Sequence, residues 1–435
     1  MTKFIVEGGR TLSGTIKPQG SKNEALQVIC ATLLTNEPVV LHNIPDIEDV
    51  KTIITLLNSL GVQITQLGKG SYQFCAAHLE KEALCNPLFR EQCMKIRGSI
   101  MLFGPLLTRF KAVTIPKPGG DRIGRRGLDA HFEGLEKLGV TFDYNAVDGV
   151  WNATYTTLQG SYIIMPEASV TGTANVIMVA SRAKGKTILY HAACEPHIQQ
   201  LCHMLVCMGV SITGIGTNLL TIEGVAELSG TVHHILPDML EIGSFIGLAA
   251  VTKSALTITD VPIELFRPVW HVFTKVLGIT LEEDGNLLHV PAQPTYAIKT
   301  KPDGSLATLY DAIWPGFPAD LISIAIIVAV HAYGHILIHQ KLYESRLFFV
   351  DRLIEMGANL VLCDPHRVHV VGLNGSYRLR GIAMISSDIR AGITLLIAAL
   401  AAEGTSVIEN VGQIDRGYEA IDTRLNSLGA SVVRI

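Results

Sequence analysis

The sequence has little of what marks zinc-binding, disulfide-bonded or nucleic-acid-binding proteins. Its eight cysteines include no Cys-x-x-Cys pair, a pattern that fits neither a zinc site nor a disulfide framework in so long a chain. Only 17% of the residues are charged and the formal net charge is −4, which gives no general attraction to nucleic acid or to an anionic membrane. An anionic ligand must therefore be held by a local cluster of Arg and Lys.

Long apolar segments are also missing, although the mean hydropathy is positive at +0.34. The most apolar run, residues 321–330, is about half the length needed to cross a bilayer, so we expect a buried core helix there. The N-terminal Met1-Thr2-Lys3-Phe4 has none of the zones of a signal peptide. Together with the unpaired cysteines, this predicts a protein of the reducing cytoplasm, with neither a membrane nor nucleic acid as a partner.

The chain does have length and apolar content. Its 435 residues, 48% of them hydrophobic, predict two or three domains with a large core. A short pattern, an apolar residue followed by Gly and a small apolar residue, recurs about every 70 to 80 residues. The copies are Leu60-Gly61-Val62, Leu138-Gly139-Val140, Met208-Gly209-Val210, Leu277-Gly278-Ile279, Met356-Gly357-Ala358 and Leu428-Gly429-Ala430.

The repeated pattern predicts a helix that ends at the Gly and a strand that follows it. Five of the six copies have Leu four residues before the Gly, on the same helix face as the apolar residue just before it. Gly readily adopts the left-handed conformation that ends a helix, and alternating apolar residues then begin a strand. Each repeat has a second helix-to-strand unit, such as residues 28–34 before 39–42. Six repeats predict an α/β fold in two halves, divided near residue 235.

Two segments in the first half carry polar residues where packing does not need them. Gln19-Gly20-Ser21-Lys22-Asn23-Glu24 precedes an apolar helix; Ser21 or Asn23 can cap this helix, and Lys22 is then beside its N-terminus, where anions bind. Residues 116–126 form a Pro- and Gly-rich loop with Arg122, Arg125 and Arg126. These arginines could clamp phosphates, or they could belong to a solvated loop.

Three segments in the second half have the same character. Asp320, at the end of Trp314-Pro315-Gly316-Phe317-Pro318-Ala319-Asp320, either caps the apolar helix that follows or is a general base. An Asp stands one or two positions before an Arg at two expected helix starts, in Ser387-Asp388-Ile389-Arg390 and in Asp415-Arg416-Gly417-Tyr418-Glu419. Each pair could be no more than a local ion pair.

Taken together, the motifs resemble the UDP-N-acetylglucosamine 1-carboxyvinyltransferase family, in the family's order and over essentially the whole chain. The matching segments are residues 20–23, Arg97-Gly98-Ser99-Ile100, the Pro-Gly-Gly loop, residues 317–320, residues 387–390 and residues 415–419. The resemblance implies an inside-out α/β barrel of two domains, each with three βαβαββ repeats around buried helices. The implied domains are residues 22–235, and residues 1–21 plus 236–435, with the active site in the cleft between them.

The resemblance also implies an activity. The enzyme would transfer the enolpyruvyl group of phosphoenolpyruvate to the 3′-hydroxyl of UDP-N-acetylglucosamine, the first committed step of peptidoglycan synthesis, without a metal or cofactor. By residue match, phosphoenolpyruvate would be bound by Lys22, Arg126 and Arg416, with Asp388 and Arg390 close by. The nucleotide sugar would be bound by Asn23, Arg97, the loop after Arg125, Ser169, Val170, Asp320 and Leu342. Asp320 would take the proton of the attacking hydroxyl.

The sequence departs from the family pattern at two positions. The residue after Pro-Gly-Gly is usually a cysteine that protonates C3 of phosphoenolpyruvate and can form a thioether with it. Here it is Asp121, as in one branch of the family, so a proton can be donated but no thioether can form. Glu167 stands where a lysine is common.

Two other functions compete with this interpretation. The related 5-enolpyruvylshikimate-3-phosphate synthases lack the Pro-Gly-Gly loop with its proton donor. A non-catalytic nucleotide-sugar sensor would not need the cations Lys22, Arg390 and Arg416. A metal stripe at His331, His335 and His339 is not expected, because Gly334 and a strand pattern interrupt the helix between them.

Overall fold

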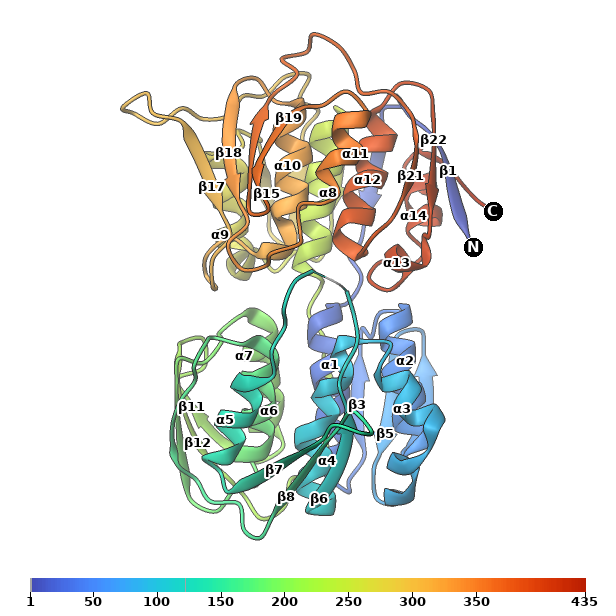
Figure 1. Cartoon of the computed structure of the whole chain (residues 1–435). Helices are drawn as coiled ribbons and strands as arrows, with labels where there is room; N and C mark the ends of the chain where they lie inside the picture. The colour runs from blue at the N-terminus through green and yellow to red at the C-terminus, as the bar shows by residue number, and fades with distance from the viewer. Residues whose placement is uncertain (1, 122) are drawn as a thin grey trace. The chain divides into compact units, whose positions relative to one another are not determined.

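The computed structural model describes residues 2–121 and 123–435 (Figure 1). The chain forms two compact units. The N-terminal unit comprises residues 20–121 and 126–236, and the C-terminal unit comprises residues 2–19, 123–125 and 237–435.

The N-terminal unit alternates short helices with strands. Its helices are α1 (Lys22–Ala31), α2 (Glu48–Ser59), α3 (Pro87–Cys93), α4 (Phe103–Phe110), α5 (Asp129–Glu136), α6 (Val170–Ala180), α7 (Pro196–Cys207) and the 3₁₀ turns η1 (Thr32–Leu34), η2 (Lys81–Cys85) and η3 (Arg97–Leu102). Its strands are β3 (Val39–His42), β4 (Gln63–Gly68), β5 (Ser71–Cys75), β6 (Ala112–Pro116), β7 (Val140–Asn145), β8 (Val150–Tyr155), β9 (Tyr162–Ile164), β10 (Lys186–Tyr190), β11 (Ser211–Thr213), β12 (Leu219–Glu223) and β13 (Thr231–His234).

The C-terminal unit repeats this arrangement. Its helices are α8 (Met239–Val251), α9 (Ile263–Lys275), η4 (Ala319–Leu321), α10 (Ile322–His331), α11 (Val350–Glu355), α12 (Ile389–Ala401), α13 (Gly412–Asp415) and α14 (Ile421–Ser427). Its strands are β1 (Lys3–Glu7), β2 (Ser13–Ile16), β14 (Ala255–Ile258), β15 (Glu282–Asp284), β16 (Leu287–Val290), β17 (Ala307–Tyr310), β18 (His335–His339), β19 (Asn359–Asp364), β20 (Arg367–Val371), β21 (Ala383–Ile385), β22 (Thr405–Glu409) and β23 (Ser431–Arg434).

The described residues contain six small sheets, three in each unit, so the six predicted repeats are confirmed. Five sheets have four strands in equivalent order, such as β9-β10-β12-β11 and β17-β18-β20-β19, and the sixth is β6-β8-β7. In the two four-stranded examples, the first pair is parallel and the others are antiparallel. The six repeat glycines all have a positive φ, between 75° at Gly278 and 105° at Gly357. This is the left-handed conformation that the repeat pattern predicts.

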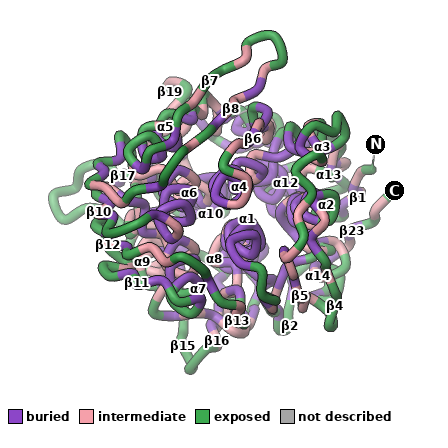
Figure 2. Tube along the Cα trace, turned by 90° about the horizontal axis from the view of Figure 1, so that it is seen from below, coloured by how far each residue is buried: buried purple, intermediate pink, exposed green. Residues whose placement is uncertain are grey.

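Apolar helices form the core of each unit. In the C-terminal unit, α8, α10 and α12 pack against one another, and nearly all residues of α10 are buried. In the N-terminal unit, α6 packs against both α4 and α5. Figure 2 shows α1, α4 and α6 as buried coils, with exposed residues mainly on the surrounding strands and loops. All but the first residue of the run 321–330 lies in α10, which is the predicted core helix. No helix in the described part of the chain is long and apolar enough to cross a membrane.

Candidate functional site

The predicted lysine of the N-terminal unit lies at the start of a buried helix. Ser21 is the N-cap of α1, and its hydroxyl accepts a hydrogen bond from the backbone N–H of Glu24 at 3.4 Å, as predicted. Lys22 follows the cap, with Nζ 2.6 Å from Oδ2 of Asp49 and both side chains less than a tenth exposed. A buried charge is stable only when it is paired, and Asp49 provides the opposite charge for Lys22. The neighbouring Asn23 is half-buried.

A second buried carboxylate fixes the same helix start. Oε2 of Glu24 accepts a hydrogen bond from the backbone N–H of Leu236 at 3.2 Å, and Oε1 lies 2.9 Å from Nε2 of His233. In return, the backbone N–H of Ser21 donates to the carbonyl of Leu236 at 2.7 Å. The segment that carries Lys22 is therefore held at a fixed place in the N-terminal unit.

The Pro-Gly-Gly loop packs closely against the segment that carries Arg97. A Cβ on Gly119 would lie 1.7 Å from the carbonyl oxygen of Met94, and one on Gly120, whose φ is +100°, would lie 2.8 Å from Cβ of Arg97. Only glycine fits these positions. Nη2 of Arg97 donates to the carbonyl of Gly127 at 2.9 Å. The structure therefore brings Arg97 together with the Gly-Gly pair of the loop and with the residue that follows the loop.

The other predicted residues of this loop differ in exposure. Asp121 and Arg126 are half-buried, and Arg125 is exposed. Arg122, the third arginine of the predicted cluster, lies outside the described residues.

The predicted nucleotide contacts Ser169 and Val170 lie at the start of α6. Ser169 caps this helix, accepting from the backbone N–H of Gly172 at 3.3 Å. Glu167, the departure from the family pattern, is exposed just before it. A helix N-terminus with free N–H groups attracts anionic groups, which suits the residues assigned to a nucleotide.

A buried polar network supports the start of α6. Oδ1 of Asn175 accepts from the backbone N–H of Gly104 at 2.8 Å, so its Nδ2 is the donor to Nδ1 of His131 at 3.0 Å. Nε2 of His131 therefore carries the ring proton and donates to Oγ1 of Thr171 at 3.0 Å. Burial lowers the pKa of His131 to about 3, and the charge of Arg97 adds to this effect. The ring is thus neutral at neutral pH, and it connects α5 to α6.

In the C-terminal unit, the structure gathers an acid between two buried arginines. Asp320 accepts from Nη2 of Arg346 at 2.6 Å through Oδ1 and from Nη2 of Arg390 at 3.0 Å through Oδ2. Both arginine side chains are 9% exposed, and that of Asp320 is 24% exposed. Asp320 does not cap α10, whose N-cap is Leu321 without a side-chain hydrogen bond. Of the two interpretations of Asp320, the structure excludes the cap.

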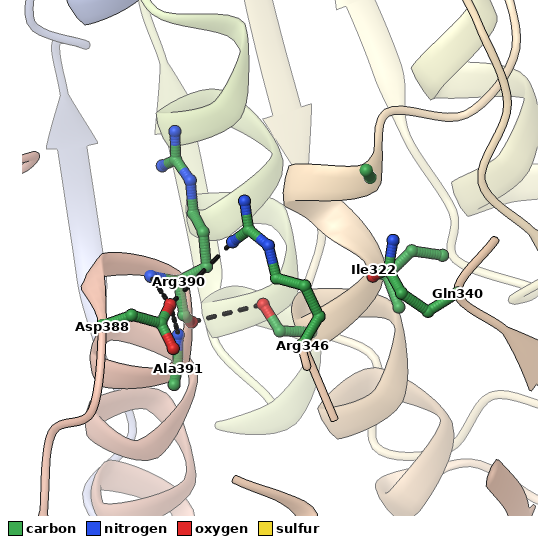
Figure 3. A pocket seen from close by; sticks show the side chains of 8 residues that line it. Ile322, Gln340, Arg346, Asp388, Arg390 and Ala391 are labelled. Atoms are coloured by element: carbon green, nitrogen blue, oxygen red, sulfur yellow. Dashed lines mark hydrogen bonds and ion pairs between the residues drawn. The ribbon is translucent and has the colours of Figure 1, made fainter. Parts of the chain in front are cut away.

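In the motif around Asp388, the Asp caps a helix and Arg390 provides a cation. Oδ1 of Asp388 caps α12 by accepting from the backbone N–H groups of Arg390 and Ala391 at 3.0 and 3.1 Å. The side chain of Arg390 points away from this cap, and its Nη1 donates to the hydroxyl of Tyr418 at 3.3 Å. The two side chains therefore have different partners, and the local ion pair between them is not what the structure shows. Figure 3 shows Arg346 beside Arg390, with Asp388 at the start of the helix.

The electrostatics of this cluster keep Arg390 positively charged and suit the binding of an anion. Burial alone would lower the pKa of Arg390, but the Asp320 carboxylate and Tyr418 outweigh it, so the pKa is raised. Burial raises the pKa of Tyr418 to about 12, against the pull of Arg390, which keeps its hydroxyl a hydrogen-bond donor. Nε of Arg346 is buried with no hydrogen-bond partner among the residues that the structure describes. Such a donor is available to an anion.

A small pocket lies at this cluster. Its lining residues are Ala319, Ile322, Ser323, Gln340, Arg346, Asp388, Arg390 and Ala391. Two predicted residues of the same unit are not in the lining. Leu342 is nearly half exposed, two residues after Gln340, and Nη1 of Arg416 donates to Oε1 of Gln413 at 2.8 Å.

Arg346 is the main residue that the sequence did not indicate. It lies between β18 and α11 in a segment without a Gly, a Pro or a repeated motif, and its partner Asp320 is 26 residues away in the chain. Leu342, four residues earlier in the same segment, is indicated by the family resemblance alone.

The histidine triplet has a structural explanation. His331 ends α10, with Nδ1 3.1 Å from the carbonyl of Ile327, while His335 and His339 lie on β18. Burial lowers the pKa of His331 to about 4. Within residues 2–121 and 123–435, no group of three or more His, Cys, Asp or Glu side chains is placed to hold a metal ion.

Comparison with known proteins identifies the class to which the fold belongs. The family model of EPSP synthase (3-phosphoshikimate 1-carboxyvinyltransferase) matches residues 6–425. Among solved structures, the enolpyruvyl transferase NikO from Streptomyces tendae superposes with a TM-score of 0.86 at 19% identity, covering 100% of this chain and 98% of that one. EPSP synthase from Acinetobacter baumannii gives a TM-score of 0.73 at 16% identity, covering 100% of both chains. The fold is that of the enolpyruvyl transferases, which confirms the predicted α/β fold class.

Relatives with similar sequences show which family of enolpyruvyl transferases the chain belongs to. The UDP-N-acetylglucosamine 1-carboxyvinyltransferase of Bacteroides thetaiotaomicron is 54% identical over 435 residues, covering all of both chains. The enzyme of the same name from Porphyromonas gingivalis is 51% identical over 435 residues, again covering all of both chains. The chain belongs to the family of UDP-N-acetylglucosamine 1-carboxyvinyltransferases.

Proposed function

We propose that this protein transfers the enolpyruvyl group of phosphoenolpyruvate to the 3′-hydroxyl of UDP-N-acetylglucosamine and releases phosphate, opening peptidoglycan synthesis. The observation that carries the proposal is the buried cluster of Asp320, Arg346 and Arg390. A carboxylate that bridges two arginines provides a base beside a site for an anion, and the reaction needs both.

Phosphoenolpyruvate has a carboxylate and a phosphate, and the chain has cations for both. Arg346 and Arg390 form planar forks that match a carboxylate or a phosphate, and the buried Nε of Arg346 adds a donor. Lys22, Arg126 and Arg416 are assigned to the same substrate by family match, with Asp388 ordering the backbone at Arg390. These five positively charged residues would stabilise the negative charge that develops as phosphate leaves.

The nucleotide sugar is assigned to a different set of residues. Asn23, Arg97, Ser169, Val170 and Leu342 would bind it, and the free N–H groups at the start of α6 suit a phosphate or a carbonyl oxygen. The neutral His131 network would hold Ser169 and Val170 in place.

The chemistry then proceeds by addition and elimination. Asp320 accepts the proton of the 3′-hydroxyl as its oxygen attacks C2 of phosphoenolpyruvate, and Asp121 donates a proton to C3. The tetrahedral intermediate then loses phosphate from C2 and a proton from C3, which restores the double bond. No metal or cofactor takes part in this scheme.

Release of phosphate tests the proposal. The purified protein should release phosphate from phosphoenolpyruvate only when UDP-N-acetylglucosamine is present. Shikimate 3-phosphate as the acceptor should give no release, which separates this function from that of EPSP synthase. Binding of UDP-N-acetylglucosamine without any phosphate release would favour a nucleotide-sugar sensor and overturn the proposal.

Two further expectations belong to the same proposal. The two domains would be residues 22–235 and residues 1–21 plus 236–435. The protein would act in the cytoplasm, an environment that suits its eight free cysteines.

A further inference from the structure

A buried carboxylate outside all of the motifs lies next to the pocket. Asp311 follows β17 directly and its side chain is fully buried. An ionised group in such a position must be fully hydrogen-bonded. Its partners all lie in one segment, the residues that follow β18.

Three donors of this segment converge on Asp311. The backbone N–H of Lys341 donates to Oδ1, the backbone N–H of Leu342 donates to Oδ2 at 3.1 Å, and Nε2 of Gln340 donates to Oδ2 at 2.5 Å. Lys341 also places its ammonium 3.5 Å from the ring centroid of Tyr310. The carboxylate therefore caps the end of β18 in the way that an acidic N-cap satisfies the first turn of a helix.

The same segment is held from its other side by the turn between β19 and β20. The backbone N–H of Gln340 donates to the carbonyl of His366 at 2.7 Å, and Nδ1 of His366 lies 2.9 Å from the carbonyl of Gln340. Gln340 itself is buried and lines the pocket (Figure 3). Residues 340–342 are thus fixed, although Leu342 is nearly half exposed.

We propose that Asp311 is a positioning residue that fixes segment 340–346 for both substrates. The segment carries Leu342, assigned to the nucleotide sugar, and Arg346, which pairs with Asp320. Asp311 holds residues 340–342 directly, and the backbone N–H of Ser345 is held separately by the carbonyl of Ile123 at 3.1 Å. Loosening Asp311 therefore displaces Leu342 directly and Arg346 through the three residues that connect them. The proposal rests on the proposed function for the identity of the substrates, while the anchoring itself rests on the contacts of Asp311.

The test compares Asp311→Asn and Asp311→Ala with the wild type. Asn keeps one oxygen acceptor but turns a donor toward the backbone N–H groups, so at least one hydrogen bond to a charged acceptor is lost. Such a loss corresponds to about a tenfold effect. We expect the KM values for UDP-N-acetylglucosamine and phosphoenolpyruvate each to rise about tenfold in the Asn variant, and more in the Ala variant.

Hydrogen exchange gives a readout that does not depend on activity. The amide protons of Lys341 and Leu342, which donate to Asp311, should exchange faster in Asp311→Asn, while those of β18 stay protected. Asp303→Asn is the matched control, because Asp303 also accepts a backbone N–H, from Ser305 at 3.0 Å, but does so on an exposed turn. This control should leave both KM values and the exchange of residues 340–346 unchanged.

The KM, kcat and exchange results distinguish a positioning role of Asp311 from a purely structural one. A lower kcat with unchanged KM values would mean that Asp311 only stabilises the fold, and it would overturn the proposal. Faster exchange without any rise in KM would overturn it as well, as would unchanged exchange. A wild type without phosphate release would instead contradict the proposed function, and the exchange data would still decide whether Asp311 anchors the segment.

Discussion

Replacing Asp320 by Asn removes one negative charge from between two buried arginines. The carboxylate accepts one hydrogen bond from Arg346 and one from Arg390. The isosteric amide keeps one oxygen acceptor, so about one charged hydrogen bond is lost. This loss should lower the free energy of unfolding by about 1.5–3 kcal/mol. Loss of the general base should lower kcat by about 10²–10⁴-fold.

The affinity of Asp320→Asn for phosphoenolpyruvate should not fall, although its stability does. In the free Asn variant, the charges of Arg346 and Arg390 are less compensated, so an anion that binds them relieves more repulsion than in the wild type. The rise in melting temperature caused by phosphoenolpyruvate should therefore be at least as large in the variant as in the wild type. The assay combines phosphate release with thermal unfolding, with and without phosphoenolpyruvate.

The exposed Asp303, on the same unit, provides the matched control. Asp303→Asn should leave turnover and the phosphoenolpyruvate-induced shift in melting temperature unchanged. An Asp320→Asn variant that keeps most of its turnover would refute the assignment of the base. A variant that loses turnover and no longer responds to phosphoenolpyruvate would show that Asp320 organises the arginines rather than accepting a proton.

Two further predictions concern the N-terminal unit. The pKa of His131 is lowered to about 3 by burial, so the unfolded chain binds a proton that the folded chain does not between about pH 6.5 and 3. The free energy of unfolding decreases as the pH falls through this range, and His131→Gln should reduce this pH dependence by up to about 1.4 kcal/mol per pH unit. Chemical denaturation at pH 7 and pH 5 measures the effect, with the exposed His203→Gln as the control. An equal pH dependence in the wild type and in His131→Gln would contradict the prediction. Asp121 is not a thiol, so the epoxide fosfomycin, which alkylates the family's usual cysteine, should not inactivate the wild type, whereas Asp121→Cys should become sensitive. A fosfomycin adduct on the loop of the wild type, detected by mass spectrometry, would be the contrary result.

The repeats could be predicted from the sequence because their signals are local. Each repeat glycine follows the end of a helix, and the conformation that it must adopt depends on its own backbone. Gly61 and Gly429, at opposite ends of the chain, accordingly have φ values of 87° and 100°. The cap at Ser21 was predictable for the same reason, since its partner is three residues away.

The pairing of charges could not be predicted in this way. Asp320 has the sequence position of a helix cap, but its partners lie 26 and 70 residues away. Only the packing of α10 and α12 in one core brings them together. Arg346 carries no signal because it lies in an irregular segment, and the contact from Asp311 to Leu342 of this segment spans 31 residues of the chain. The sequence indicated residues with suitable chemistry, and the fold decides which of them meet.

The central claim is the transfer itself, and identification of the product tests it most directly. UDP-N-acetylglucosamine and phosphoenolpyruvate, incubated with the protein, should give a nucleotide sugar heavier by one carboxyvinyl group. Proton NMR should show two vinyl protons and attachment at the 3′-oxygen, with one phosphate released for each product molecule. Recovery of unchanged nucleotide sugar, or phosphate release without a carboxyvinyl product, would contradict the account.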